Sequence, residues 1–187
     1  MNDIRKLSLA ELAALICDSL RKKGVKTTLS GGACAELYSH NKYITADIDF
    51  VVNYVWPGNR AIIQRIMTSL GFHKEGRIFI NESVVYSVEF PPGPLSIGDE
   101  CRIVPVELNL KTGRLSLLSP TDSVKDRLAG YFYGNDAQCL KQAVMICQMN
   151  KVSLSNIRDW AKKEGQSEKM KRFERLLKKP GESHERY

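Results

Sequence analysis

The alternation of apolar and polar residues divides the chain into an N-terminal part with both helices and strands and a C-terminal part that is helical. Ser8 and Glu11 form a capping box before apolar residues at helical spacing, which predicts a helix that ends near Gly24. A second helix of this kind is predicted between Pro57 and Gly71. Short runs typical of strands occupy residues 25–29, 46–53, 77–80, 83–90 and 102–110, with 77–80 and 83–90 forming a hairpin.

A second pattern begins at Ser119, where a capping residue, a proline at the first helical position and an acid in the first turn predict a helix start. Helical spacing then continues to residue 179, with breaks at Gly134, at 150–153 and at Gly165 that predict four helices. We therefore predict an α/β (α+β) fold. A small mixed-sheet core flanked by helices spans residues 1–118, and a helical region spans residues 119–187.

Two carboxylates lie on one predicted strand. Asp47 and Asp49 are two residues apart, so both point to one face, about 7 Å apart, while Ile48 and Phe50 face the core. Their repulsion costs about 2 kcal/mol at an effective dielectric near 20, and a bound cation would remove it. The pattern predicts a Mg²⁺ site, although an isolated Asp-x-Asp is also common in surface strands.

A glycine turn precedes these acids. Gly31 and Gly32 let the backbone approach a ligand closely, and the residues after them can begin a helix whose free N–H groups attract a phosphate. Ser30, Gly31 and Gly32 are thus predicted to bind nucleotide phosphates beside the metal, since Mg²⁺ in proteins usually binds one or two carboxylates together with substrate phosphates.

The glycine pair, a helix and then Asp-x-Asp on a strand resemble the nucleotidyltransferase superfamily, which includes DNA polymerase β, minimal nucleotidyltransferases and AbiEii-type toxins. The resemblance continues through residues 90–95 and 119–128. It implies a third carboxylate from a later strand, for which we prefer Glu89 and keep Glu107 as the alternative. It also implies that Lys125 faces the nucleotide. The gap between Gly32 and Asp47 is longer than usual, which indicates an unusual loop around residues 40–46.

Several of these residues have an alternative interpretation that is purely structural. Glu89 could be a solvated residue at a strand edge, and Lys125 an exposed lysine beside Asp126. Asp136 either reaches the cleft or caps the next helix. Cys34 lies at a predicted helix start, where a thiol pKa can fall.

Composition and charge indicate a small protein without a membrane-spanning segment. The net charge is +7, and residues 162–187 contain nine basic and five acidic residues. Such a tail either contacts RNA or DNA or forms a solvated face. The five cysteines are scattered without a zinc-binding pattern, and neither a spanning segment nor a secretory signal is found. We therefore expect a cytoplasmic protein.

The resemblance implies a Mg²⁺-dependent nucleotidyltransferase with Asp47, Asp49 and Glu89 as catalytic and metal-binding residues. The donor would be a nucleoside triphosphate. The acceptor hydroxyl would lie on RNA, such as a tRNA 3′ end, on a partner protein, as in toxin–antitoxin systems, or on a small molecule such as an aminoglycoside. The alternative is a catalytically silent binding module or antitoxin partner with this fold.

Overall fold

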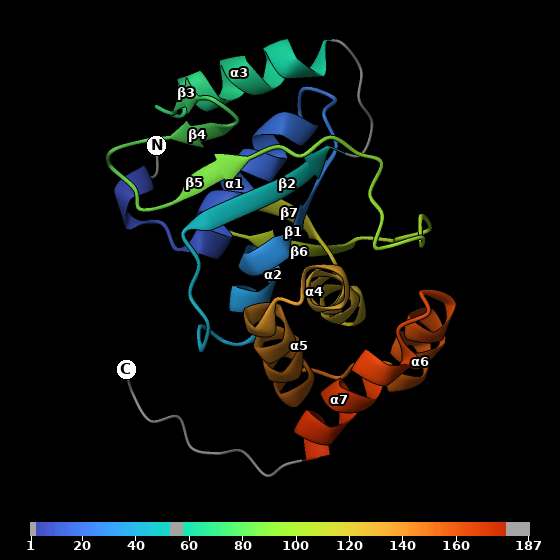
Figure 1. Ribbon diagram of the computed structural model, residues 1–187. Helices are drawn as coiled ribbons and strands as arrows, with labels where there is room; N and C mark the ends of the chain where they lie inside the picture. Colours follow the sequence, from blue (N-terminus) through green and yellow to red (C-terminus); the bar gives the residue numbers. More distant parts are fainter. Residues whose placement is uncertain (1–2, 53–57, 179–187) are drawn as a thin grey trace.

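The computed structural model describes residues 3–52 and 58–178, which form one mixed sheet with helices on both faces (Figure 1). The seven strands follow the order β3-β4-β5-β2-β1-β7-β6. Their bounds are β1 Thr27–Ser30, β2 Asp47–Val52, β3 His73–Glu75, β4 Ile78–Ile80, β5 Ser87–Glu89, β6 Val106–Leu110 and β7 Gly113–Leu117. The helices are η1 Ile4–Lys6, α1 Leu9–Arg21, α2 Gly31–Tyr38, α3 Asn59–Ser69, α4 Pro120–Gly134, α5 Ala137–Met149, α6 Leu154–Lys163 and α7 Ser167–Lys178.

The centre of the sheet combines antiparallel and parallel pairing. Strand β2 pairs antiparallel with β1 and parallel with β5, and β1 pairs parallel with β7. Helix α1 packs on β1, β6 and β7 and also contacts α3, while α2 contacts β1, β2, α4 and α5. The mixed α/β fold is confirmed, and α2 connects the sheet to the C-terminal helices.

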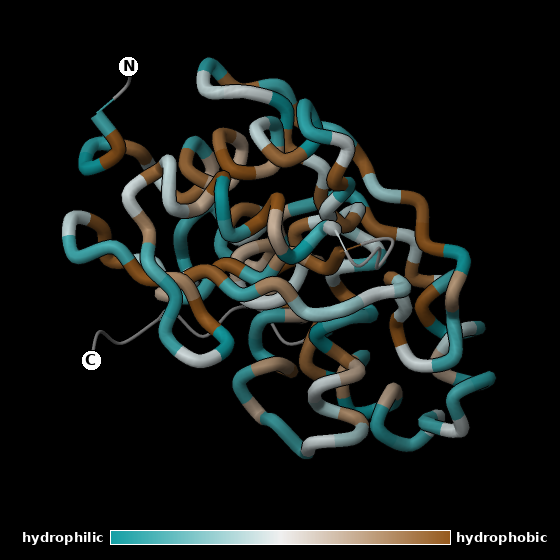
Figure 2. The backbone as a smooth tube through the Cα atoms, turned by 90° about the horizontal axis from the view of Figure 1, so that it is seen from above, coloured by the Kyte–Doolittle hydropathy of each residue, from teal (hydrophilic) through white to brown (hydrophobic). Residues whose placement is uncertain are grey.

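One hydrophobic core runs through the described part of the chain, from Leu9 in α1 to Phe173 in α7. Ile48 and Phe50 are fully buried, as predicted, and the Phe50 ring stacks on Phe90 with 5.9 Å between centroids. Seen from above, hydrophobic segments run through the middle of the molecule and hydrophilic segments occupy most outer turns (Figure 2). The core includes residues on both sides of position 118, so the sheet and the C-terminal helices are stabilised by the same packing.

The helix ends follow their sequence signals. Ser8 and Glu11 make both hydrogen bonds of the capping box, and the Ser119 side chain accepts the N–H of Asp122 at the start of α4. The four C-terminal helices begin and end close to the predicted breaks. Among the described residues, no helix combines the length and the apolar character needed to cross a membrane.

The strands differ more from the prediction. Only residues 106–110 of the expected strand 102–110 pair, and they form a hairpin with β7, which the sequence analysis missed. Strand β4 pairs with β5 as predicted, but β5 begins at Ser87, so a longer loop replaces the expected two-residue turn. Strand β3 was also missed because its three residues are all exposed and show no alternation.

Candidate functional site

The predicted carboxylates lie on two neighbouring strands. The alternation of β2 buries Ile48 and Phe50 and leaves Asp47 and Asp49 on the other face. The parallel register places Glu89 of β5 opposite Asp49 and Ser87 opposite Asp47. The Ser87 hydroxyl donates a hydrogen bond of 2.7 Å to Asp47 Oδ1. We call Asp47, Asp49 and Glu89 the acidic cluster.

The charges of the acidic cluster act on one another. The pKa of Asp49 is raised from 3.8 to about 6, first because the carboxyl group is buried and then because Glu89 and Asp47 are negatively charged. The positive charge of Arg127 lowers this pKa in part. Ionised Asp49 is therefore disfavoured without a compensating cation, which is the electrostatic condition of a cation site.

The glycine turn lies directly against the acidic cluster. Gly31 follows β1 and begins α2. Its φ of +68° is a backbone conformation that residues with a side chain rarely adopt. A Cβ atom at this position would lie 2.6 Å from Asp49 Oδ2. The Ser30 hydroxyl donates to the Asp49 carbonyl oxygen at 3.5 Å. The structure thus brings Ser30, Gly31 and Asp49 together, and the glycine makes this approach possible.

The loop before β2 holds Asp47 in place. Buried Glu36 accepts the backbone N–H of Thr45 at 2.7 Å, and the Thr45 hydroxyl accepts the N–H of Asp47. In the same loop, His40 and Asn41 both have positive φ angles, so the backbone between α2 and β2 is irregular there.

Asp126, to which the sequence analysis gave no role, lies at the predicted phosphate-binding site. The Gly31 N–H donates to Asp126 Oδ2 at 3.2 Å, and the same oxygen accepts two hydrogen bonds from the Arg127 guanidinium. A phosphate bound at this N–H would take the place of Asp126 and would be close to Arg127. The charged run at residues 125–127 was the only sequence signal, and it does not reveal a contact between residues 95 positions apart.

Lys125 is buried, with 2% of its side chain exposed. Its Nζ lies 2.7 Å from Glu100 Oε2 and 3.6 Å from Asp122 Oδ1. The interpretation as an exposed lysine is therefore wrong. Two carboxylates bind the amine in this structure, and its contact with a triphosphate stays a prediction.

Glu107 does not join the acidic cluster. It lies on β6 at the edge of the sheet, and β7 and β1 separate β6 from β2. Its carboxylate pairs with Arg114 at 3.2 Å. The register of β5 instead places Glu89 opposite Asp49, so the alternative assignment of Glu107 as the third carboxylate is wrong.

Two other candidates have structural roles. Cys34 is fully buried, and burial raises the pKa of its thiol to about 12. The expectation of a lowered pKa is therefore wrong, because the desolvation of the thiol raises its pKa more than the helix N-terminus lowers it. Asp136 accepts the N–H groups of Gln138 and Cys139, so it caps α5.

The basic tail partly stabilises the helical region. Lys169 Nζ donates to Asn135 Oδ1 at 2.7 Å and to the Phe132 carbonyl oxygen at the end of α4. Arg158 of α6 forms an ion pair with Glu174 of α7. Contact of the tail with nucleic acid stays a prediction, and residues 179–187 lie outside the described part.

The donor atoms of the acidic cluster suit Mg²⁺, which prefers oxygen ligands and usually takes one or two carboxylates from the protein. Within residues 3–52 and 58–178, no group of three His, Cys, Asp or Glu side chains is already arranged closely enough to hold a metal ion. Glu89 instead pairs with Arg77, with 3.5 Å between Glu89 Oε1 and Arg77 Nε. Asp47 and Asp49 would hold the cation, and Glu89 would join them after leaving Arg77.

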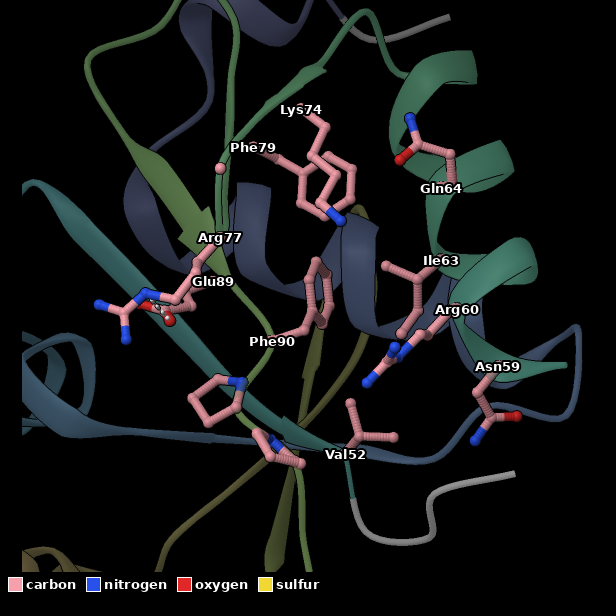
Figure 3. Close-up of a pocket in the computed structure, with 13 residues that line it drawn as sticks. Val52, Asn59, Arg60, Ile63, Gln64, Lys74, Arg77, Phe79, Glu89 and Phe90 are labelled. Atoms are coloured by element: carbon pink, nitrogen blue, oxygen red, sulfur yellow. Dashed lines mark ion pairs between the residues drawn. The ribbon is translucent and has the colours of Figure 1, made fainter. Parts of the chain in front are cut away.

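A cavity of about 660 Å³ opens beside Glu89 (Figure 3). Its walls come from α3, the β3–β4 hairpin, the end of β2 and the segment after β5. Asp47 and Asp49 do not line it, so Glu89 is the residue that the cavity shares with the acidic cluster. The lining residues are Val52, Asn59, Arg60, Ile63, Gln64, Lys74, Gly76, Arg77, Phe79, Glu89, Phe90, Pro91 and Pro92.

The same arrangement of helices and strands occurs in known proteins. An antigenic nucleotidyltransferase-like protein from Paracoccidioides brasiliensis superimposes with a TM-score of 0.62 at 15% sequence identity, over 91% of this chain and 92% of that one. The chain has a nucleotidyltransferase-like fold. The antibiotic-resistance factor ANT(2″)-Ia matches with a TM-score of 0.51 at 10% identity, over 90% of this chain and 94% of that one. No family model and no curated protein matches the sequence.

Replacing Asp49 by asparagine should stabilise the metal-free protein above pH 6. Because folding raises the pKa of Asp49 from 3.8 to about 6, its ionisation destabilises the folded state fully above pH 6 and not below about pH 4. Asp49→Asn should therefore raise the free energy of unfolding by about 3 kcal/mol at pH 8, and the gain should fade near pH 4. Thermal melts at both pH values measure this, with Asp159→Asn on α6 as an exposed control. A variant that melts below the parent at pH 8 would show that Asp49 is a structural residue.

Proposed function

We propose that this protein is a metal-dependent nucleotidyltransferase that moves a nucleoside monophosphate from a nucleoside triphosphate to a hydroxyl group. The observation that carries the proposal is the placement of Asp47, Asp49 and Glu89 on adjacent strands against the Gly31 turn. The nucleotidyltransferase-like fold supports it.

Each part of the site has a role in this reaction. Ser30, Gly31 and Gly32 would bind the phosphate tail at the start of α2, with Arg127 released from Asp126 to the same phosphates. Bound Mg²⁺ would neutralise the charge that develops on the phosphates. The acceptor oxygen forms a bond to the α-phosphorus while the bond from this phosphorus to the bridging oxygen breaks. Pyrophosphate leaves, and the acceptor proton passes to a carboxylate of the acidic cluster.

The resemblance to AbiEii-type and minimal nucleotidyltransferases supports finer proposals about the acceptor and the biological setting. These are transfer to RNA or to a partner protein in the cytoplasm, as part of a toxin–antitoxin system. The fold that the chain shares with an antibiotic-resistance factor keeps a small-molecule acceptor, such as an aminoglycoside, as a further candidate.

The test is transfer of label from each α-³²P nucleoside triphosphate, with Mg²⁺, to total RNA and total protein. The control is the double variant Asp47→Asn/Asp49→Asn. Label that depends on Mg²⁺ and disappears in the double variant would establish the activity and the acceptor class. If neither fraction is labelled and no pyrophosphate is released with added small-molecule hydroxyl compounds, the enzyme proposal is wrong.

A second candidate function, a silent binding module, is favoured by one observation. The Asp126 carboxylate already accepts the hydrogen bond from the Gly31 N–H, and Arg77 already pairs with Glu89. If the protein's own side chains permanently satisfy the site, a nucleotide should show no Mg²⁺-dependent binding and no turnover. Isothermal titration of a triphosphate with and without Mg²⁺ separates the two functions.

A further inference from the structure

Strand β6 forms an exposed apolar edge of the sheet. It is the last strand in the sheet order, and within residues 3–52 and 58–178 it pairs only with β7. Val106 and Leu108 of this strand are 39% and 41% exposed, and Val104, two residues before it, is 78% exposed. A strand with an unpaired edge and exposed apolar side chains is a template for pairing with another strand.

The apolar side chains of β6 continue a buried row of the sheet. The register with β7 places Leu108 opposite Leu115 and Val106 opposite Leu117, and residues opposite each other share a face. Leu115 and Leu117 are buried, and Gly113 on the same face of β7 lies against α1. The row of apolar side chains therefore leads from the core beneath α1 to the edge of the sheet.

The backbone of β6 also presents hydrogen-bonding groups at this edge. A turn of two residues joins Leu110 to Gly113, so these two residues form a hydrogen-bonded pair. Because such pairs alternate along a strand, the N–H and C=O groups of Glu107 and Asn109 point away from β7. Pro105 has no N–H and cannot extend this row of donors.

The strand is complementary to itself in one antiparallel register. This register places Leu108 opposite Leu108 of a second copy, Val106 opposite Leu110, and Glu107 opposite Asn109. The outward N–H and C=O groups of Glu107 and Asn109 then bond to each other, and the Asn109 amide faces a carboxylate that accepts its hydrogen bond. Centring the pair on Glu107 would oppose two carboxylates, and centring it on Asn109 would leave Val106 opposite the turn.

The charged groups around this edge are already paired within the chain. Glu107 lies 3.2 Å from Arg114 of β7, and Lys111 in the turn lies 2.8 Å from Glu11 of α1. Pairing of two β6 strands therefore does not require an unpaired charge to be buried.

We propose that two copies of this chain associate through β6, so that their sheets join by antiparallel β6–β6 pairing about a twofold axis at Leu108. Because one surface pairs with itself, the assembly closes at a dimer. Strands β7 and β1 separate β6 from β2, so both acidic clusters stay accessible. An interface of one strand from each copy is small, and we expect a Kd of roughly 1 to 100 µM.

The test is sedimentation velocity of the full chain at concentrations below and above this Kd. We expect a monomer–dimer equilibrium, and Leu108→Lys should raise the Kd by about tenfold or more because two ammonium groups would face each other at the axis. The melting temperature should stay close to that of the parent, since Leu108 is already 41% exposed. Val85→Lys is the control, because it adds the same charge at a 79% exposed residue just before β5, and it should leave the Kd unchanged.

Cysteine cross-linking tests the register independently of any effect on folding. Opposed residues outside the hydrogen-bonded pairs have Cα atoms about 4.5 Å apart, within the range that a disulfide spans. Leu108→Cys should therefore form a disulfide-linked dimer with oxidised glutathione, in a Cys101→Ser background that removes an exposed thiol. Val106→Cys is the matched control, since Val106 is similarly exposed but its two copies would lie about 14 Å apart.

Four results would overturn the proposal. The first is a chain that stays monomeric at every concentration, and the second is a dimer that Leu108→Lys does not weaken or that Val85→Lys weakens equally. The third is equal cross-linking of Leu108→Cys and Val106→Cys, which would indicate random collisions. The fourth is growth beyond the dimer, which would show that β6 pairs with a different surface of the second copy.

Discussion

Glu89→Gln is expected to lower nucleotidyl transfer by about 10³-fold or more while the melting temperature stays close to that of the parent. The glutamine keeps the size of the side chain but removes the charge that the third carboxylate contributes opposite Asp49. A group that acts on charge developing in the transition state typically accounts for about 10²- to 10⁴-fold in rate. The fold should tolerate the change because, among the described residues, the ion pair that Glu89 loses is to Arg77, whose side chain is 88% exposed.

Glu107→Gln is the matched control for this substitution. Both glutamates lie on strands, and each pairs with one exposed arginine, but Glu107 is on β6 at the other side of the sheet. Turnover of the best labelled triphosphate should be unchanged in this variant. Equal activity of the two variants would remove Glu89 from the catalytic set, and a large drop in melting temperature for Glu89→Gln would assign it a structural role instead.

The sequence predicted the parts of this site that depend on local geometry. The period of two in β2 places Asp47 and Asp49 on one face, and the structure buries Ile48 and Phe50 on the other. The capping signals at Ser8 and Ser119 were equally local, and both caps form. Such signals involve residues within one turn or one strand, so no tertiary information is needed to interpret them.

Contacts between distant segments could not be predicted in this way. The parallel register that sets Glu89 opposite Asp49 joins residues 40 positions apart, and only the family resemblance favoured Glu89 over Glu107. The carboxylate of Asp126 at the Gly31 N–H depends on how α4 packs against α2, and buried Lys125 pairs with Glu100, 25 positions earlier in the chain. Strand β3 shows no alternation because all of its residues are exposed.

Gly31→Ala should be among the most destabilising single substitutions in the site, by about 2 to 4 kcal/mol. About 1 to 2 kcal/mol comes from placing an L side chain at a φ of +68°. The remainder comes from the new Cβ, which would lie 2.6 Å from Asp49 Oδ2 and force the carboxylate away from its place in the acidic cluster. Urea unfolding measures the change in free energy, and binding of a triphosphate with Mg²⁺ should be lost at the same time.

Gly24→Ala isolates the backbone part of this effect. Gly24 has a φ of +84°, but a Cβ there meets nothing within 4 Å, so its substitution should cost only about 1 to 2 kcal/mol. A double-mutant cycle with Asp49→Ala isolates the contact, because the alanine retains only the Asp49 Cβ, at 3.5 Å from the new methyl group. In that background Gly31→Ala should cost no more than Gly24→Ala does in the parent. If the cost of Gly31→Ala is the same with and without the Asp49 carboxylate, the glycine is needed for the backbone turn alone and not for its approach to the acidic cluster.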